Sequence, residues 1–286
     1  LSFAINAFTD PGDLVAIQPP VYGPFAKSVE NAGRTVYRNA LRQTDAGWQM
    51  DLDNLEAGLR QGVKLLLLCS PHNPVGRVWT EAELRRLSAL CARYGAKIVA
   101  DEIHADFEMP GQRHTPMLTI DPNAVAFVSA TKTFNLAGLR NSSMLFGNAG
   151  DKAKMESFMR GVGIGEINLF GMLAQTAAYR HGAAWLDALL EYLDGTRALV
   201  EKTIAGRMPR ARVSRLEGTY LIWLDLRAYG LTQEEIRRKL VFEAAAALND
   251  GTAFGAEGEG FARMNIAAPR ASVLAALERI ADAFEK

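Results

Sequence analysis

Short runs of aliphatic and β-branched residues recur along the first half of the chain, with helical patterns between them. The runs that predict strands are LVAI (14–17), TVY (35–37), VKLLLLC (63–69), KIVA (97–100), AVAFVS (124–129) and SMLF (143–146). Strands that are apolar on both faces and alternate with helices are typical of a parallel sheet covered by helices. The sequence therefore predicts an α/β layer with a largely parallel sheet.

The clearest helical pattern is TEAELRRLSALCARYG (80–95), where apolar residues recur every three or four positions. Thr80 and Glu83 predict a capping box at its start, and Gly95 predicts its end. After about residue 150 we expect helices at 166–181 and 185–207, a strand at 219–226, a helix after Thr232, a glycine-rich segment at 249–261, a strand at 262–266 and a helix at 272–284. These patterns predict a large domain at 1–185 and a smaller C-terminal α+β domain at 186–286.

The charge balance points to a small-molecule partner. The 32 Lys and Arg residues equal the 32 Asp and Glu residues, so the electrostatic footprint of a dedicated nucleic-acid or membrane-surface binder is missing. The longest apolar run, LLLLC (65–69), is far shorter than a transmembrane helix. We therefore expect neither a nucleic-acid partner nor a membrane partner.

Cysteine and histidine usage excludes two classes of stabilising site. Cys69 and Cys91 are the two cysteines, and both lie in apolar segments, which argues against a disulfide framework or a thiolate zinc site. We expect a reduced, cytoplasmic setting. The histidines at 72, 114 and 181 have no paired ligands at metal spacing, so no metal is predicted. The chain begins with LSFAINAFTDPGD, without a methionine and inside an apolar helical pattern, and we expect an N-terminal part of the natural protein to precede it.

Polar residues follow directly after several of the predicted strands. In an α/β sheet ligands bind at the carboxyl ends of strands, so these residues are the ones to consider. Asp101 follows KIVA and must sit at a buried strand end, where a carboxylate needs a cationic partner. An ion pair with an arginine is the structural alternative. DEIH (101–104) also resembles a helicase box, but that chemistry needs a GxxxxGK[ST] loop, and the chain has no Gly-Lys dipeptide.

Lys132 lies in SATKTFNLAGLR (129–140), directly after another predicted strand. A lysine that is partly removed from water can offer its neutral amine to a carbonyl carbon, which is the basis of Schiff-base chemistry. Ser129, Thr131 and backbone amides of this turn could donate hydrogen bonds to a phosphate, and Arg140 could grip the same group. An amine beside a phosphate cradle suggests an aldehyde cofactor that carries a phosphate.

SATKTFNLAGLR resembles the lysine signature of pyridoxal-phosphate enzymes of the class I/II aminotransferase family, which have the aspartate-aminotransferase fold (fold type I). PPVYGPF, CSPHNPVGRVW, VADEIHADF and FARMNIAAPR fall in the order and rough spacing of that family, across essentially the whole chain. DEIHADF, SATKTFNLAGL and NLFG (168–171) are most similar to its MalY/PatB-like cystathionine β-lyase group. The resemblance implies a three-layer α/β/α large domain with a mostly parallel mixed sheet, pyridoxal 5'-phosphate as cofactor, and a homodimer.

The resemblance also implies a role for each matching residue. Lys132 would bind pyridoxal phosphate covalently and then move protons at the substrate Cα. Asp101 would pair with the pyridinium nitrogen, so that the ring acts as an electron sink. The remaining roles are a hydrogen bond to the phenolic oxygen and contact with the substrate from Asn73, stacking on the ring from Tyr22, phosphate binding by Ser129 and Arg140, and binding of the substrate α-carboxylate by Arg263. Arg270, at a predicted helix start, is the weaker candidate for the carboxylate.

His104 favours one branch of the family. Many aminotransferases of this fold place a tyrosine at this position, three residues after the aspartate, whereas the C–S lyase group tends to have a histidine. Whether the imidazole touches the cofactor or packs behind it stays open. The expected function is therefore β-elimination from cystathionine or a related cysteine S-conjugate, giving a thiol, pyruvate and ammonia. An aminotransferase acting on an L-amino acid is the close alternative, and a cofactor-binding regulatory or interaction protein is a further one.

Two other segments receive structural interpretations. GVGIGE (161–166) superficially resembles a dinucleotide loop, but no strand is predicted before it, so a substrate-side loop is expected instead. The Met and aromatic residues of INLFGMLAQTAAY (167–179) predict a helix that faces the core.

Overall fold

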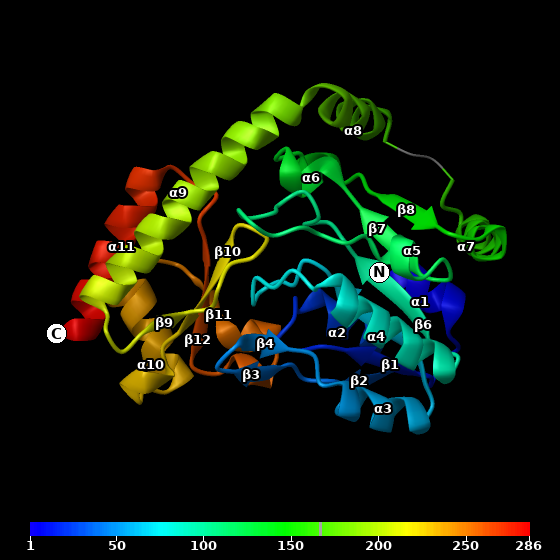
Figure 1. Ribbon diagram of the computed structural model, residues 1–286, viewed down its shortest axis with the longest axis horizontal. Helices are drawn as coiled ribbons and strands as arrows, with labels where there is room; N and C mark the ends of the chain where they lie inside the picture. The colour runs from blue at the N-terminus through cyan, green and yellow to red at the C-terminus, as the bar shows by residue number, and fades with distance from the viewer. Residues whose placement is uncertain (166–167) are drawn as a thin grey trace.

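The computed structural model describes residues 1–165 and 168–286, arranged around two main sheets that share no strand. The first half of the chain builds the larger sheet and the last third builds the smaller one, as the colour change from blue and green to yellow and red shows (Figure 1). The long helix α9 (Ala183–Arg207) runs from one part to the other.

The larger sheet has six strands in the order β2-β1-β5-β6-β7-β8, and only β8 runs antiparallel to its neighbour among the described pairs. Their bounds are β1 (Leu14–Ile17), β2 (Thr35–Arg38), β5 (Val63–Cys69), β6 (Lys97–Asp101), β7 (Val125–Val128) and β8 (Ser143–Phe146). All six coincide with predicted strands to within one or two residues. The mostly parallel mixed sheet is confirmed.

Helices cover both faces of this sheet because the central strands are apolar on both sides. In β5, Leu65 and Leu67 pack into one buried cluster, whereas Leu66 and Leu68 pack into another. The helices with residues in the first cluster are α1 (Ser2–Phe8), α2 (Pro24–Asn31) and α7 (Ala149–Gly161). Those of the second are α3 (Leu52–Arg60), α4 (Glu81–Arg93) and α5 (Met117–Ile120). The result is the predicted α/β/α arrangement, and Thr80 with Glu83 forms the predicted capping box of α4.

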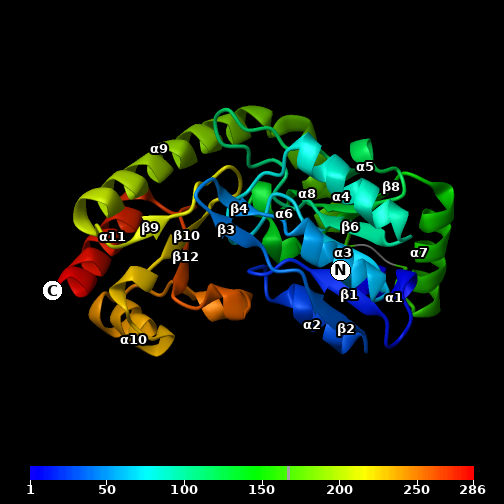
Figure 2. The same ribbon diagram turned by 60° about the horizontal axis from the view of Figure 1, so that its bottom comes forward.

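The smaller sheet has the antiparallel order β11-β12-β10-β9. Its strands are β9 (Arg212–Val213), β10 (Leu221–Asp225), β11 (Asn249–Asp250) and β12 (Phe261–Asn265). Helices α9, α10 (Gln233–Arg238) and α11 (Arg270–Glu285) pack with it around a third buried cluster. The turned view shows α9 arching over this part of the molecule (Figure 2). The clusters interlock, because Trp223, Phe254 and Phe261 pack with the larger sheet's cluster, whereas Phe107 and Met109 pack with the smaller sheet's cluster. The division into domains at 1–185 and 186–286 stays a prediction.

Several short elements were not predicted from the sequence. The β3–β4 hairpin (Arg42–Thr44, Gly47–Gln49) lies beside the smaller sheet in both views (Figures 1 and 2), and Trp48 Nε1 donates to Ser214 Oγ over 3.0 Å. The others are α6 (Ala130–Thr133), the 3₁₀ turns η1 (Ala137–Leu139), η2 (Arg227–Tyr229), η4 (Gly251–Phe254) and η5 (Ala256–Gly258), and the π-helical turn η3 (Lys239–Glu243).

One prediction about helix packing is wrong. Helix α8 (Leu169–His181) does not bury its apolar residues, since Phe170 is 73% exposed and Leu169 and Leu173 are each 56% exposed. The apolar residues surround much of this helix, so their spacing does not single out a buried face. Two predicted positions, Glu166 of the glycine run and Ile167 of this segment, lie outside the described residues. The described part of the glycine run follows helix α7, as expected for a loop without a preceding strand.

Candidate active site

The carboxyl ends of the central strands meet the edge of the smaller sheet at a cavity of about 200 Å³. Six of the eight predicted site residues line it: Tyr22, Asn73, Asp101, His104, Lys132 and Arg263. The first five follow or end strands of the larger sheet, whereas Arg263 comes from β12 of the smaller one. The fold therefore gathers residues that lie up to 241 positions apart in the sequence (Tyr22 to Arg263).

Asp101 is the last residue of β6, and one of its oxygens accepts a hydrogen bond from the backbone N–H of Ile103 over 3.2 Å. No described arginine or lysine forms an ion pair with it, so the alternative of a structural arginine pair is not realised in this part of the chain. Burial raises the pKa of Asp101 to about 6, while the positive charge of Lys132 acts in the opposite direction. A buried carboxylate without a close cation is costly, and a ligand cation would relieve that cost.

Lys132 sits in the single turn of α6, which begins directly after β7. Ser129 caps this turn by accepting a hydrogen bond from the backbone N–H of Thr131 over 3.1 Å. Thr133 anchors the other end by donating to the Asp106 carboxylate over 2.6 Å. The backbone that carries Lys132 is thus held on both sides, and Lys132 lines the cavity.

Arg263 crosses from the smaller sheet to the turn after β5. Its Nη1 donates to Asn73 Oδ1 over 2.8 Å, and its Nη2 donates to Asn249 Oδ1 over 2.8 Å. Its guanidinium carbon lies 4.7 Å from the ring centroid of Phe254, which is a cation–π distance. The Nε group is buried and has no partner among the described residues, and desolvation lowers the pKa of Arg263.

His104 is buried at the back of the cavity. Its ring lies edge-on to Tyr220, with centroids 5.5 Å apart, and 6.0 Å from the ring of Phe107. Desolvation first, and then the charges of Lys132 and Arg263, lower its pKa to about 3. His104 is therefore a neutral imidazole near pH 7, and its Nδ1 has no partner among the described residues.

Ser129 and Arg140 do not belong to the residues that line this cavity in the described part of the chain. The Ser129 hydroxyl donates to the backbone carbonyl of Asn141 over 2.6 Å. Arg140 is exposed, has a left-handed backbone with φ of 49°, and makes no side-chain contact with a described polar partner. Their role toward a phosphate stays a prediction.

Sequence reasoning missed several residues of the cavity wall: Phe25, Cys69, Ile103, Tyr220, Leu221 and Asn265. Tyr220 is the most consequential, because its ring touches His104 and it is half-buried at the cavity edge. Tyr220 directly precedes β10 of the smaller sheet, far along the chain from the strands that carry the other site residues. The one sequence signal that could have indicated a site residue here was a tyrosine, with its polar hydroxyl, at the start of an apolar strand.

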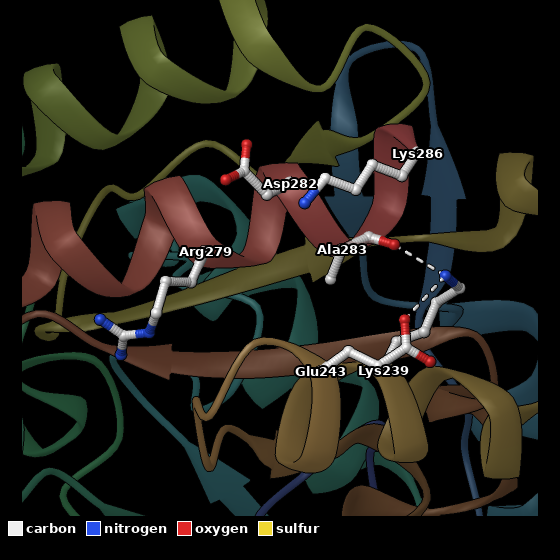
Figure 3. Close-up of a pocket in the computed structure, with 6 residues that line it drawn as sticks. All are labelled: Lys239, Glu243, Arg279, Asp282, Ala283 and Lys286. Atoms are coloured by element: carbon white, nitrogen blue, oxygen red, sulfur yellow. Dashed lines mark hydrogen bonds and ion pairs between the residues drawn. The ribbon is translucent and has the colours of Figure 1, made fainter.

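A second hollow, of about 280 Å³, lies far along the chain between η3 and α11 (Figure 3). Two of its cations, Lys239 and Arg279, already have partners. Lys239 Nζ donates to the Ala283 carbonyl over 2.7 Å and to Glu243 over 3.3 Å, and Arg279 Nε donates to the Ala244 carbonyl over 2.7 Å. None of its described lining residues has a buried, unpaired polar atom of the kind found at His104 and Arg263.

The residues around Lys132 suit a small ligand that brings its own polar groups. Arg263 Nε and His104 Nδ1 are buried without a partner among the described residues, Asp101 is half-buried, and all three residues line one cavity. Among the described residues, no three His, Cys, Asp or Glu side chains come together as a metal site would require. None of the described helices is both long and apolar enough to cross a bilayer.

Comparison with known proteins gives the family. The sequence model described as "Aminotransferase class I and II" matches residues 1–280. The chain belongs to this family. Within the class I and II aminotransferases, it is 37% identical to cystathionine β-lyase PatB from Bacillus subtilis, over 98% of this chain and 74% of that protein. It is 33% identical to protein MalY from Escherichia coli, over 96% of this chain and 71% of that protein.

Solved structures of family members agree with this assignment. A PLP-bound putative aminotransferase from Clostridium difficile superimposes with a TM-score of 0.96 at 38% identity, over 99% of this chain and 74% of that one. Cystalysin from Treponema denticola, which contains pyridoxal 5'-phosphate, also superimposes with a TM-score of 0.96. Its identity is 31%, over 99% of this chain and 73% of that one. The predicted family and fold are confirmed.

Proposed function

We propose that this chain is a pyridoxal-phosphate-dependent C–S β-lyase, which cleaves cystathionine or related cysteine S-conjugates to a thiol, pyruvate and ammonia. The observation that carries the proposal is the single cavity in which Lys132, Asp101 and Arg263 meet. The similarity of this chain to PatB, MalY and cystalysin supports the same function.

The residues fit the cofactor. Lys132 lines the cavity and its amine would bind the aldehyde carbon, and the half-buried carboxylate of Asp101 would receive the ring nitrogen. Asn73 would hydrogen-bond the phenolic oxygen, Tyr22 would lie against the ring, and Ser129 with Arg140 would hold the phosphate. When bound, pyridoxal phosphate supplies an electron sink for the carbanion at the substrate Cα.

The protein supplies binding and proton transfer. Arg263 would hold the substrate carboxylate, since its two terminal nitrogens form a planar fork suited to a carboxylate. Lys132 would take the proton from Cα as the general base. The Cβ–S bond then breaks, the thiolate takes up a proton, and water converts the released three-carbon fragment to pyruvate and ammonia.

Adding pyridoxal phosphate to the purified protein tests the cofactor assignment. A visible absorption band is expected for the wild type and for Lys202→Ala, a control at an exposed lysine of α9. The band is expected to disappear in Lys132→Ala. A band of equal strength in Lys132→Ala would overturn the assignment.

Product analysis separates the lyase from the aminotransferase. Pyruvate and a thiol are expected from cysteine S-conjugates without any added keto acid. Strict dependence on a keto acid would show that the proton is returned to the cofactor, and the chain would then be an aminotransferase. A biological effect that survives Lys132→Ala unchanged would instead support a regulatory or interaction protein.

The homodimer and the cytoplasmic location belong to the same proposal. Exposed apolar residues on α8, among them Leu169, Phe170 and Leu173, would be covered by a second copy. Cys69 and Cys91 are free and buried, which suits a reducing compartment. Sedimentation analysis of the wild type against Phe170→Asp tests the dimer, and an unchanged sedimentation coefficient would exclude this face.

A further inference from the structure

A larger cavity, of about 510 Å³, adjoins the cavity described above. The two share Lys132, Tyr220 and Asn265. We call it the aromatic pocket, because its main walls are Phe107, Trp185, Leu189, Tyr192, Leu193 and Tyr220. Lys132 therefore stands between a polar cavity that holds Arg263 and an apolar cavity walled largely by α9.

The walls of the aromatic pocket are fixed by packing. The ring of Trp185 lies 5.5 Å from that of Phe134, with an interplanar angle of 32°, and Phe134 comes two residues after Lys132. Gly182 makes room for Phe134, because a Cβ atom at Gly182 would lie 2.2 Å from the Phe134 ring. On the other side, Phe107 and Tyr220 meet edge-on with centroids 4.9 Å apart. The pocket is thus a preformed feature of the fold.

The pocket offers little to a charged group. Lys132 is the one charged side chain among its described lining residues, and the other polar groups belong to Thr133, Asn135, Asn265 and the hydroxyls of Tyr192 and Tyr220. Arg270 is close by but is committed elsewhere, since its Nε donates to Thr196 Oγ1 over 3.1 Å and its Nη2 to the Tyr192 carbonyl over 2.9 Å. An ammonium placed in this pocket would lose water without gaining a carboxylate as its partner, and a carboxylate would find no arginine among the described lining residues.

We propose that the aromatic pocket binds the substituent on the substrate sulfur, and that the enzyme therefore prefers S-alkyl- and S-aryl-L-cysteines to cystathionine. The inference rests on the proposed lyase function. With the substrate carboxylate on Arg263 and Cα near Lys132, the chain beyond sulfur continues toward the far side of Lys132. The distal end of cystathionine carries both an ammonium and a carboxylate, whereas an alkyl or aryl group matches the walls.

The reaction is the same for every member of this class. The Cα–H and Cβ–S bonds break, and the sulfur leaves with the bonding electrons and takes a proton as a thiol. One water molecule completes the balance, so S-alkylcysteine and water give thiol, pyruvate and ammonium. Only the group on sulfur changes, so differences in kcat/KM along a series report on the pocket.

A homologous series from S-methyl- to S-hexyl-L-cysteine, assayed with the cofactor-loaded enzyme, is the first test. We expect kcat/KM to rise about two- to fourfold for each added methylene, as transfer of a CH₂ group from water to an apolar site predicts. S-butylcysteine is expected to exceed cystathionine at least tenfold. A flat series, or a preference for cystathionine, would overturn the proposal.

Substitutions at Trp185 are the second test. Trp185→Arg places a cation at the pocket mouth and is expected to lower kcat/KM for S-butylcysteine while raising it for cystathionine. Trp185→Phe is expected to keep the wild-type order of substrates. The matched control is Phe242→Ala, which changes an aromatic residue that is 78% exposed on η3 and away from the pocket. An unchanged order of substrates in Trp185→Arg would contradict the proposal.

Fluorescence gives a readout that does not depend on turnover. Trp185 is 50% exposed, whereas Trp48, Trp79 and Trp223 are at most 5% exposed, so iodide quenching reports mainly on Trp185. S-hexylcysteine is expected to protect Trp185 from iodide, and S-methylcysteine is not. Equal quenching with both ligands would argue against the assignment of the pocket.

β-Chloro-L-alanine separates a failure of this inference from a failure of the proposed function. Its leaving group is a small chloride that does not reach the aromatic pocket. Pyruvate from β-chloroalanine together with a flat S-alkyl series would keep the lyase and reject the pocket. Absence of pyruvate from every substrate would reject the lyase itself and with it the inference.

Discussion

Nη1 of Arg263 donates a hydrogen bond to Oδ1 of Asn73 over 2.8 Å and so joins the smaller sheet to the turn after β5. Asn73 is fixed in turn by its backbone, whose carbonyl accepts from the N–H of Tyr22 over 3.2 Å. The proposed carboxylate site is therefore formed by both sheets together. Neither sheet alone carries all of its groups.

Arg263→Ala should raise KM for the amino-acid substrate by about 10- to 100-fold, because hydrogen bonds to a charged group contribute about 1.5–3 kcal/mol. Arg263→Lys should recover part of the loss, since an ammonium keeps the charge without the planar fork. Steady-state kinetics measure both effects, with Arg212→Ala on β9 as an exposed control. A wild-type KM in Arg263→Ala would remove Arg263 from the site.

In the cofactor-free protein, the free energy of unfolding of the wild type should fall as the pH rises from about 4 to above 6. Asp101→Asn lacks the ionising carboxyl, so its free energy of unfolding should not show this fall. Below pH 3.8 the carboxyl is protonated in both the folded and the unfolded state. Between 3.8 and about 6 the unfolded state ionises first, and this lowers the free energy of unfolding by up to about 3 kcal/mol. Urea unfolding of both proteins at several pH values measures the difference.

The cofactor should reverse the order of stability of the wild type and Asp101→Asn. With pyridoxal phosphate bound, Asp101 would pair in its ionised form with the ring nitrogen, and the wild type should then be the more stable of the two proteins near pH 7. A difference between wild type and Asp101→Asn that does not change with pH in the cofactor-free protein would contradict the burial of this carboxyl.

Arg77 and Glu217 should show strong coupling in a double-mutant cycle. Arg77 Nε lies 2.7 Å from Glu217 Oε2, which also accepts from the N–H of Val78 over 3.0 Å, and each side chain is only 12% exposed. Arg77→Ala leaves the Glu217 carboxylate largely buried without its close cation and should lose about 2–4 kcal/mol of unfolding free energy. Glu217→Ala should lose less, because Arg77 keeps its ion pair with Glu83 at 2.9 Å. The double variant should lose much less than the sum.

The exposed pair Arg85–Glu81 on α4 is the matched control for this cycle. Its N–O distance is 2.6 Å, yet the side chains are 60% and 57% exposed. Water screens such a pair, and its coupling should stay below about 1 kcal/mol. Similar coupling energies in the two pairs would show that burial does not set the strength of the Arg77–Glu217 pair.

The His104 ring should remain uncharged down to about pH 5. Desolvation lowers its pKa to about 3, so its ring-proton NMR signals should not move between pH 8 and pH 5. The signals that disappear in His104→Gln identify the residue. A midpoint near the ordinary value of 6.5 would mean that water or a counter-charge reaches the ring.

Much of the larger sheet and of the site was predictable, because strands buried on both faces leave long aliphatic runs, and because ligands bind where parallel strands end. Lys132, Asp101 and Asn73 all follow such runs. Tyr220 and Trp185 were not predictable, since each reaches Lys132 from an element that follows it by more than fifty positions and carries no local signal of that contact. The exposure of Phe170 was missed because an all-round apolar helix does not show which face is covered.

Helix α9 connects the aromatic pocket with the core of the smaller sheet. Its first turns carry Trp185 and Leu189 of the aromatic pocket, and its later turns carry Val200 and Ile204, which pack in the core of the smaller sheet. Leu189 and Ile204 are about 22 Å apart along the helix axis, at 1.5 Å per residue. We therefore predict that substitutions at Val200 and Ile204 shift the position of Trp185 and Leu189 and so change the substrate preference, although neither residue lines the pocket.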